Sequence, residues 1–279
     1  MSLAWRTGAP AAEVLEHAIA QVNATLSYLR AEVGPCDTVA VGAAVADDTW
    51  LGCGDLLANP TWLEAVVRDT GERLGTDDPV VGASLFVQNY AYRVVTHAVT
   101  ALTFAGVLPD STPRTMAVTL RAGRPSAIAY LEPRVATLEP SALREDPAAA
   151  RDAVAALHEV VDVHLAPLVA GVRATTRVGA RLLWGNVAAS CAVAFRTAEG
   201  VLGPWVQPLG DAFIGASPAT MRGLGSYLVL ERGERHGWFF ERSTCCLYDR
   251  LPGKIRCGDC SRTPREQRRD AYWQSLAGD

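Results

Sequence analysis

Four of the seven cysteines lie within sixteen residues near the end of the chain. Cys245 and Cys246 are adjacent, ten residues follow, and Cys257 and Cys260 then form a C-x2-C pair. A C-x2-C turn brings two sulfurs to one metal ion, and four thiolates suit either zinc or an iron–sulfur cluster. The spacing therefore predicts one local thiolate site, not a disulfide framework distributed along the chain.

The adjacent pair of cysteines discriminates between the kinds of site. Neighbouring side chains of an extended chain point in opposite directions, so Cys245 and Cys246 reach a single tetrahedral ion only through a distorted turn. A two-iron cluster is larger and accepts ligands from divergent directions. The geometry favours a [2Fe–2S] cluster held by Cys245, Cys246, Cys257 and Cys260, and it leaves open a zinc ion and a dithiol or disulfide.

Positive charge surrounds these cysteines although the whole chain carries a formal net charge of −4. Residues 242–269 contain eight basic and three acidic residues, a local net charge of +5. Positive charge stabilises a reduced anionic cluster and attracts an acidic electron-carrier protein. Four basic residues lie close to a candidate ligand and are predicted to contact substrate or electron donor: Arg242, Arg250, Lys254 and Arg256.

The segment from Arg242 to Cys260, RSTCCLYDRLPGKIRCGDC, resembles the C-terminal signature of the FhuF-like ferric siderophore reductases. That family carries a C-C-x10-C-x2-C [2Fe–2S] site, and the spacing here matches at every cysteine. The segment Trp184-Gly185-Asn186 is more weakly similar to the same family. Family members often have proline after the last cysteine, whereas this chain has Ser261, which changes a neighbour and not the ligand set.

The resemblance implies a function for the cluster. The substrate would be a ferric siderophore, expected to be a hydroxamate, already imported into the cytoplasm. Oxygen ligands bind Fe(III) much more tightly than Fe(II), so one added electron releases the metal. The electron would come from a ferredoxin- or reductase-type donor. Two alternatives remain: a non-enzymatic siderophore-binding protein with a structural metal, and an iron- or redox-sensing cluster protein.

Composition restricts the surroundings in which this chemistry takes place. A chain of 279 residues with 49% hydrophobic residues is long enough for a large core. Its mild net charge argues against nucleic acid as a partner. We find no signal-peptide pattern and expect no transmembrane segment, because the apolar stretches fall short of about 20 residues. A cytoplasmic location follows, and there clustered cysteines usually serve metal or redox chemistry.

The remaining sequence must position the cysteines. Asn59-Pro60, Asp78-Pro79 and Asp146-Pro147 each combine a capping residue with a first-turn proline and predict helix starts. Further helices are expected over 11–29 and 178–195, with a break at Pro167. Hairpin strands are expected at 116–120 and 127–131, and strands at 227–230 and 238–240.

These elements predict an α+β fold, predominantly helical, with short antiparallel hairpins and a small C-terminal cluster-binding module. We place a helical siderophore-interacting domain at residues 1–235 and the [2Fe–2S]-binding module at residues 236–279. The chain contains no convincing flavin or nicotinamide loop, so direct oxidation of NAD(P)H is not expected.

Overall fold

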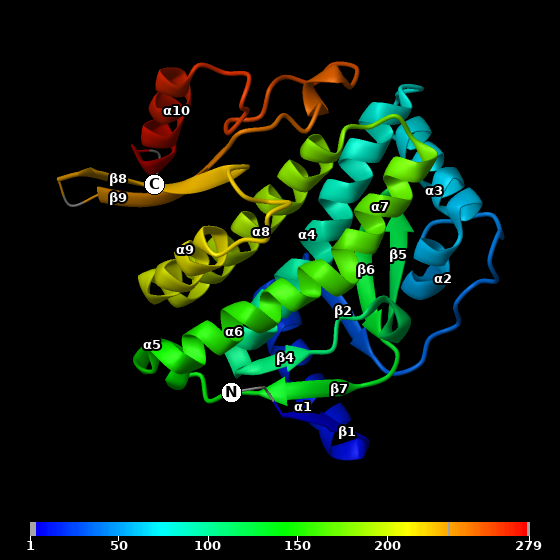
Figure 1. The fold of residues 1–279 in the computed structure, drawn as a ribbon, viewed down its shortest axis with the longest axis horizontal. Helices are drawn as coiled ribbons and strands as arrows, with labels where there is room; N and C mark the ends of the chain where they lie inside the picture. Colours follow the sequence, from blue (N-terminus) through cyan, green and yellow to red (C-terminus); the bar gives the residue numbers. More distant parts are fainter. Residues whose placement is uncertain (1–3, 234, 278–279) are drawn as a thin grey trace.

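The computed structural model describes residues 4–233 and 235–277, and helices dominate it (Figure 1). The longer helices are α1 (Ala9–Thr25), α3 (Pro60–Arg73), α4 (Pro79–Ala105), α6 (Pro147–Val160), α7 (Ala166–Thr175), α8 (Ala180–Leu202), α9 (Gln207–Gly215) and α10 (Arg265–Ala277). Short helical segments are α2 (Cys53–Ala58), α5 (Ala142–Glu145), η1 (Pro113–Thr115), η3 (Pro204–Val206) and η4 (Tyr248–Arg250). The predicted α+β class with a helical majority is confirmed.

Three of these helices begin where the sequence predicts. Asn59, Asp78 and Asp146 are the N-caps of α3, α4 and α6, and proline follows each of them in the first turn. Each capping side chain accepts a hydrogen bond from a backbone N–H two or three residues further on. These bonds satisfy donors that the first helical turn leaves free, which is why the pattern is readable in the sequence.

The strands form three small sheets. A four-stranded sheet has the order β2-β6-β5-β3, a three-stranded sheet the order β1-β7-β4, and β8 pairs with β9 alone. All pairs are antiparallel except β2 with β6. The strands are β1 (Trp5–Thr7), β2 (Arg30–Val33), β3 (Trp50–Gly52), β4 (Val107–Pro109), β5 (Met116–Arg121), β6 (Arg124–Tyr130), β7 (Arg134–Thr137), β8 (Gly225–Arg232) and β9 (Arg235–Arg242).

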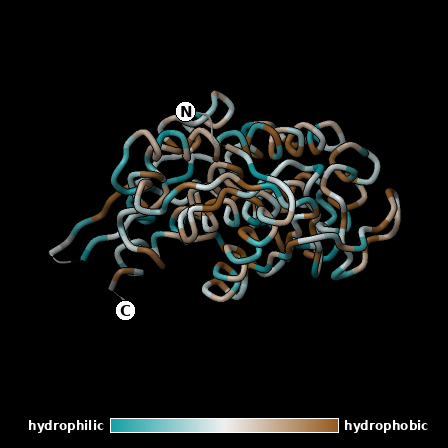
Figure 2. The backbone as a smooth tube through the Cα atoms, turned by 90° about the horizontal axis from the view of Figure 1, so that it is seen from below, coloured by the Kyte–Doolittle hydropathy of each residue, from teal (hydrophilic) through white to brown (hydrophobic). Residues whose placement is uncertain are grey.

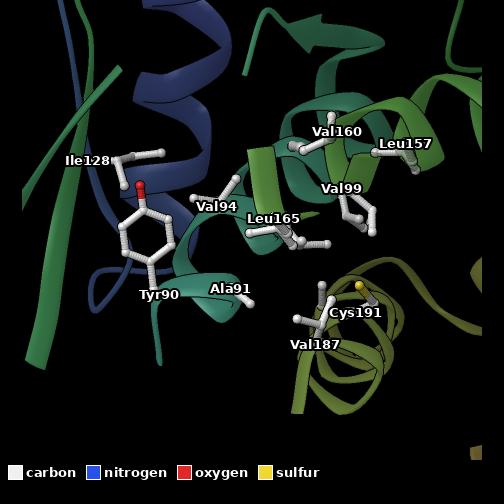
Figure 3. Close-up of a cluster of buried hydrophobic side chains, with 14 of the residues drawn as sticks. Tyr90, Ala91, Val94, Val99, Ile128, Leu157, Val160, Leu165, Val187 and Cys191 are labelled. Atoms are coloured by element: carbon white, nitrogen blue, oxygen red, sulfur yellow. The ribbon is translucent and has the colours of Figure 1, made fainter. Parts of the chain in front are cut away.

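Helices α4 and α8 lie side by side through the middle of the molecule (Figure 1). Helix α4 is buried along most of its length, and Figure 3 shows Tyr90, Ala91, Val94 and Val99 of this helix facing side chains from α6, α8 and β6. Hydrophobic and hydrophilic stretches are interspersed along the backbone (Figure 2). The buried pair α4–α8 therefore forms the centre of the core.

The predicted break at Pro167 is wrong, because the helix continues through it. Helix α6 passes into a π-helical turn, η2 (Val161–Leu165), and then into α7, where Pro167 occupies the first turn. The backbone N–H of Ala166 bonds to the carbonyl of Val161, five residues back, as expected of a π turn. Such a turn absorbs the missing N–H and the ring of the proline, which would distort a regular helix.

This continuous helix bears on the expectation that the chain has no transmembrane segment. Over Pro147–Thr175, 29 residues, it is long and apolar enough to cross a membrane by length and composition alone. In the structure 56% of the tested window is buried inside the protein, and core helices pass the same test. The helix is therefore weak evidence for a membrane span.

The C-terminal segment packs on the ends of the central helices (Figure 1). Strand β9 contributes Trp238 and Phe240 to the main core, so the β8–β9 hairpin is continuous with the rest of the molecule. After β9 the chain forms a second small core, in which Cys246, Leu247 and Leu251 pack against Val81 and Leu85 of α4. The division at residues 235 and 236 stays a prediction.

Candidate metal centre

The four clustered cysteines meet in the structure as two sulfur pairs. The Sγ atoms of Cys245 and Cys260 lie 4.0 Å apart, and those of Cys246 and Cys257 lie 3.7 Å apart. Each pair joins one member of the adjacent doublet to one member of the C-x2-C turn. Cys246 and Cys260 are buried and the other two are partly exposed, so each pair combines a buried and a more accessible sulfur.

These separations fit metal ligation better than a disulfide. Two thiolates bound at about 2.3 Å to one tetrahedral ion lie about 3.8 Å apart, whereas disulfide sulfurs lie about 2 Å apart. All four cysteines are free thiols in the structure. In the described residues, no group of three or more His, Cys, Asp or Glu side chains converges on one metal-ion position. The thiols therefore form two two-sulfur sites and no four-sulfur site for a single ion.

The turn after the doublet explains how adjacent cysteines reach different partners. Leu247 has the left-handed φ of 66°, which is uncommon for a residue other than glycine. This conformation lets its backbone N–H donate to the Sγ of Cys245 at 3.3 Å. The side chain of Leu247 is buried in the small core beside α4, and that packing compensates the strained backbone. A hydrogen bond to sulfur stabilises negative charge on it.

The four thiols have unequal affinities for protons. A hydrogen bond from Cys257, assisted by the positive charge of nearby Arg242, lowers the pKa of Cys246 to about 6. The same hydrogen bond raises the pKa of Cys257 above the ordinary thiol range. Burial raises the pKa of Cys245. One thiol of the Cys246–Cys257 pair is therefore poised to be a thiolate at neutral pH, and thiolate is the form that binds metal.

The central helices hold this cysteine loop through a buried polar chain. Ser84 of α4 donates to the backbone carbonyl of Cys246 at 2.7 Å. Asn186 of α8 donates to the Oγ and the carbonyl oxygen of Ser84 at 2.8 and 2.9 Å. Its Oδ1 accepts a bond of 2.6 Å from Arg242, which also donates to the carbonyl of Thr244. Ser84 and Asn186 are fully buried, so neither has water as an alternative partner.

Gly185 has a separate role beside Asn186. A Cβ atom at this position would overlap the side chain of Thr244, the residue immediately before Cys245. The absence of a side chain thus lets the cysteine loop approach α8. The segment Trp184-Gly185-Asn186, which carries the weaker part of the family resemblance, contributes two of the contacts that position the loop.

The four predicted basic contacts have different surroundings. Arg242 is 3% exposed and is bonded inside the polar chain, so it acts on the site from within. Arg250 is exposed and pairs with Asp78 at 3.6 Å. Arg256 pairs with Asp249 at 3.7 Å, and Lys254 lies 6.0 Å from the ring centre of Tyr248. Three of the four are therefore on the surface of the cysteine loop, where a partner could reach them.

A small cavity of about 210 Å³ opens beside one sulfur pair. It lies between the cysteine loop and α4, and Cys246 and Cys257 are part of its wall. Its other walls come from Leu74, Leu85, Gln88, Asn89, Arg124, Arg242, Tyr248 and Asp259. The Oε1 atom of Gln88 is buried and finds no hydrogen-bond partner in the described part of the chain. A small polar group next to Cys257 could therefore be accommodated there.

Three features of the site were not foreseen. Ser84 bonds to the carbonyl of Cys246, and Asn186 connects Ser84 to Arg242. Within the cysteine loop, Asp249 accepts from Cys245 and pairs with Arg256 and Arg262. The sequence singled out Asn186 only through the weaker family resemblance of Trp184-Gly185-Asn186, which assigned it no contact with the cysteine loop. No signal pointed to Ser84, because its partner lies 162 residues away.

The three scattered cysteines lie outside this site. Cys53 and Cys191 are buried, and burial raises the pKa of each to about 12. Burial also raises the pKa of Cys36, to about 11. A thiol with so high a pKa is a poor nucleophile and a poor metal ligand. All three are therefore poor candidates for metal or redox chemistry.

Comparison with known proteins places the chain in a family. Residues 84–221, about half of the chain, match the family model described as "Ferric iron reductase FhuF-like transporter". The chain belongs to the FhuF-like ferric iron reductase family. None of the curated proteins matches it at a significant level.

The matched segment begins at Ser84 and ends before the first clustered cysteine. It contains Ser84 and Asn186, which anchor the cysteine loop, and none of the four thiols. Family membership and the cysteine signature therefore rest on different parts of the sequence. Membership indicates a reductase role in iron metabolism.

Proposed function

We propose that this protein binds a [2Fe–2S] cluster and uses it to reduce a cytoplasmic ferric siderophore by one electron, with release of Fe(II). Cys245 and Cys260 would bind one iron, and Cys246 and Cys257 the other. The observation that carries the proposal is the pair of sulfur separations, 4.0 and 3.7 Å, each close to the spacing of two thiolates on one tetrahedral ion.

The arrangement also favours this cluster over the alternatives left open by the sequence. A single zinc ion needs four ligands around one position, whereas these sulfurs lie in two pairs, Cys245 with Cys260 and Cys246 with Cys257. A redox dithiol requires one pair of thiols and leaves the second pair without a role. A two-iron cluster uses both pairs, and it uses the divergent directions of Cys245 and Cys246.

When bound, such a cluster supplies one electron at a time without an obligatory proton. The residues of this chain set the electrostatic conditions for that transfer. Arg242, buried beside Cys246, places a fixed positive charge within the site, and the N–H of Leu247 donates to Cys245. Both interactions stabilise added negative charge and so raise the reduction potential. Asn186 holds Arg242 in place, which keeps this charge from reorganising during transfer.

The electron donor would approach the exposed side of the cysteine loop. Ile255 of this loop is 83% exposed and lies between Lys254 and Arg256 in the sequence. Arg250 adds a further exposed positive charge on the same loop. An apolar tip surrounded by positive charge suits an acidic ferredoxin-type protein, since complementary charge accelerates encounter and the apolar contact adds affinity.

The test is anaerobic purification followed by iron and sulfide analysis, absorption spectroscopy and electron paramagnetic resonance. We expect two irons and two sulfides per chain, and a signal of the reduced cluster that disappears when a ferric hydroxamate is added. Fe(II) trapped by a ferrous chelator should appear in equal amount. A protein that binds the ferric chelate and delivers no Fe(II) would contradict the reductase and favour a binding protein with a structural metal.

A further inference from the structure

A second and larger cavity continues from the small one beside Cys246 and Cys257. Its volume is about 790 Å³, within the range of about 300–1,000 Å³ that small-molecule sites occupy. Leu74 and Arg124 line both cavities, so the two adjoin. The larger one, here called the arginine cleft, lies between α3, α4 and the four-stranded sheet, and all four strands contribute to its lining. Five arginines line it: Arg30, Arg73, Arg93, Arg121 and Arg124.

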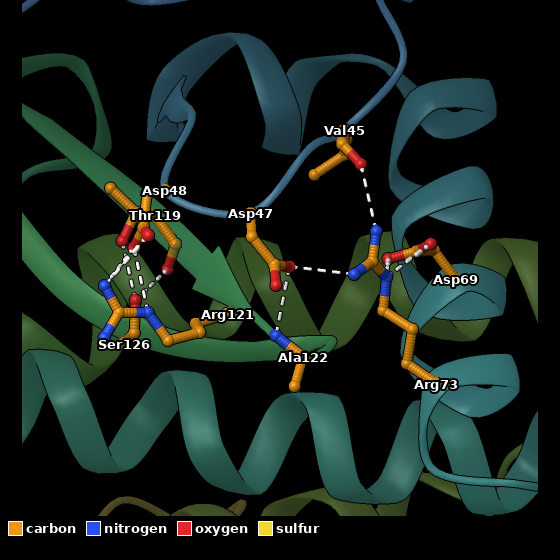
Figure 4. Close-up of polar contacts among 9 residues, drawn as sticks. All are labelled: Val45, Asp47, Asp48, Asp69, Arg73, Thr119, Arg121, Ala122 and Ser126. Carbon is orange, nitrogen blue, oxygen red and sulfur yellow. Dashed lines mark hydrogen bonds and ion pairs between the residues drawn. The ribbon is translucent and has the colours of Figure 1, made fainter.

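Two of these arginines are neutralised by carboxylates in the wall (Figure 4). Arg73 donates to Asp47 and Asp69, and Arg121 makes a bidentate pair with Asp48 at 2.8 Å. These pairs tie the loop before β3 to α3 and to the β5–β6 turn. The paired carboxylates leave these two arginines little net positive charge for a ligand. Arg30 is exposed and pairs with Glu32 at 3.3 Å.

Arg93 and Arg124 are different, because neither has a carboxylate partner in the described residues. Arg93 is partly buried and donates its Nε and Nη1 to the carbonyl oxygens of Pro125 and Tyr28, at 3.1 and 2.6 Å. These neutral acceptors orient the guanidinium and do not balance its charge. Burial lowers the pKa of Arg93, yet arginine starts so high that it stays charged at neutral pH. A partly buried cation without a counter-ion favours an anion nearby.

Helix α4 connects the arginine cleft to the small cavity beside Cys246 and Cys257. Asn89 lines the small cavity and Arg93 lines the arginine cleft, and they are four residues apart on α4. At 1.5 Å per residue this places them about 6 Å apart along the helix axis. Arg124 belongs to the walls of both cavities. A ligand of siderophore size in the cleft could therefore bind these two cations and present its iron towards Cys246 and Cys257.

We propose that the arginine cleft binds a ferric chelate of net negative charge, of the catecholate or carboxylate kind, with Arg93 and Arg124 as its anion contacts. This inference rests on the proposed function, since it gives the substrate class of the same site. It differs from the hydroxamate expected from the sequence, because three hydroxamates neutralise Fe(III) whereas three catecholates leave three negative charges. Guanidinium groups bind such oxygen anions through charge-assisted hydrogen bonds.

The experiment measures binding of gallium(III) chelates, which resemble the ferric ones and cannot be reduced at the site. Titration calorimetry compares an anionic gallium tris-catecholate with a neutral gallium tris-hydroxamate, on anaerobically purified protein at low salt. We expect the anionic chelate to bind at least 10-fold more tightly, and raising the salt concentration to weaken its binding selectively.

Two variants and a control test whether the positive charge of Arg124 binds the anionic chelate. Arg124→Gln should weaken the anionic chelate about 5-fold and Arg124→Glu more strongly, with the neutral chelate changed less than 2-fold. Arg124 is exposed and its guanidinium has no partner among the described residues, so the variants should fold. Arg173→Gln, which removes one exposed charge on α7 away from the cleft, should leave both affinities unchanged.

The outcomes separate this inference from the proposed function. Iron and sulfide are measured on the same preparations. A cluster-loaded protein that binds the neutral chelate as tightly as the anionic one, or that binds the anionic one equally well as Arg124→Glu, would overturn the inference alone. Charge-selective binding by a protein that never acquires iron and sulfide would uphold the arginine cleft and overturn the proposed function.

Discussion

Asn186 provides the sharpest test of how the helical body positions the cysteine loop. Its side chain makes three buried hydrogen bonds, two with Ser84 and one with the guanidinium of Arg242. Losing the bond to a charged group costs about 2 kcal/mol, and each neutral bond costs about 1 kcal/mol. Asn186→Ala should therefore lower the free energy of unfolding by about 4 kcal/mol, with Arg242 left buried and short of an acceptor.

Ser190 is the matched control, one turn further along α8. It is 3% exposed and makes one neutral bond, from its Oγ to the carbonyl of Gln88 on α4. Ser190→Ala should cost about 1 kcal/mol. Both variants remove polar contacts from the same α4–α8 interface, so the difference of about 3 kcal/mol isolates the chain that reaches Cys246.

The assay is urea unfolding under reducing, anaerobic conditions, followed by tryptophan fluorescence, together with the rate at which Cys246 is alkylated in the native protein. Asn186→Ala should raise the alkylation rate of Cys246 in addition to its effect on unfolding, and Ser190→Ala should not. Equal stability of the two variants, or an unchanged alkylation rate of Cys246 in Asn186→Ala, would show that Asn186 does not position the cysteine loop.

Two further predictions concern α8 and the buried histidines. Gly185→Ala should destabilise the protein by about 1–3 kcal/mol, because the added Cβ overlaps Thr244. Gly200→Ala, in open space on the same helix, should stabilise it by up to about 1 kcal/mol. Thermal unfolding measures both variants, and melting temperatures that shift in the same direction would contradict this. Burial lowers the pKa of His97 and His164 to about 4, below the unfolded value of about 6.5, so both stay neutral when folded and stability falls as pH drops from 6.5 towards 4. Each of the two histidines contributes at most about 3 kcal/mol to that loss of stability. An imidazole NMR signal of His97 or His164 that titrates near pH 6.5 in the folded protein would disprove the prediction.

Local patterns in the sequence predicted the parts of the fold that depend on neighbouring residues. The three caps identified the starts of α3, α4 and α6, because the bond from the capping side chain spans only two or three residues. The β5–β6 hairpin was likewise recognisable from its turn. Strand β2 was missed, because it pairs in parallel with β6, almost a hundred residues away, and four residues are too short a run to establish a period.

For the cysteine site, too, only the part that depends on neighbouring residues was predictable. Spacing alone indicated that four cysteines belong together, and the structure pairs their sulfurs; that they bind a cluster stays a prediction. The surroundings could not be read, because Arg242 meets an asparagine 56 residues away and Cys246 meets a serine 162 residues away. Similarly, the arginine cleft is lined by residues from α3, α4 and four strands, and none of these segments by itself indicates a ligand site.

Electron paramagnetic resonance of the dithionite-reduced protein, with iron, sulfide and zinc analysis of the same anaerobic sample, determines whether the four clustered cysteines hold a [2Fe–2S] cluster. We expect two irons and two sulfides per chain and one unpaired spin, with loss of the signal in Cys246→Ser and Cys257→Ser and its retention in Cys191→Ser. One zinc per chain without sulfide, or an iron-free protein after reconstitution with iron and sulfide, would contradict it.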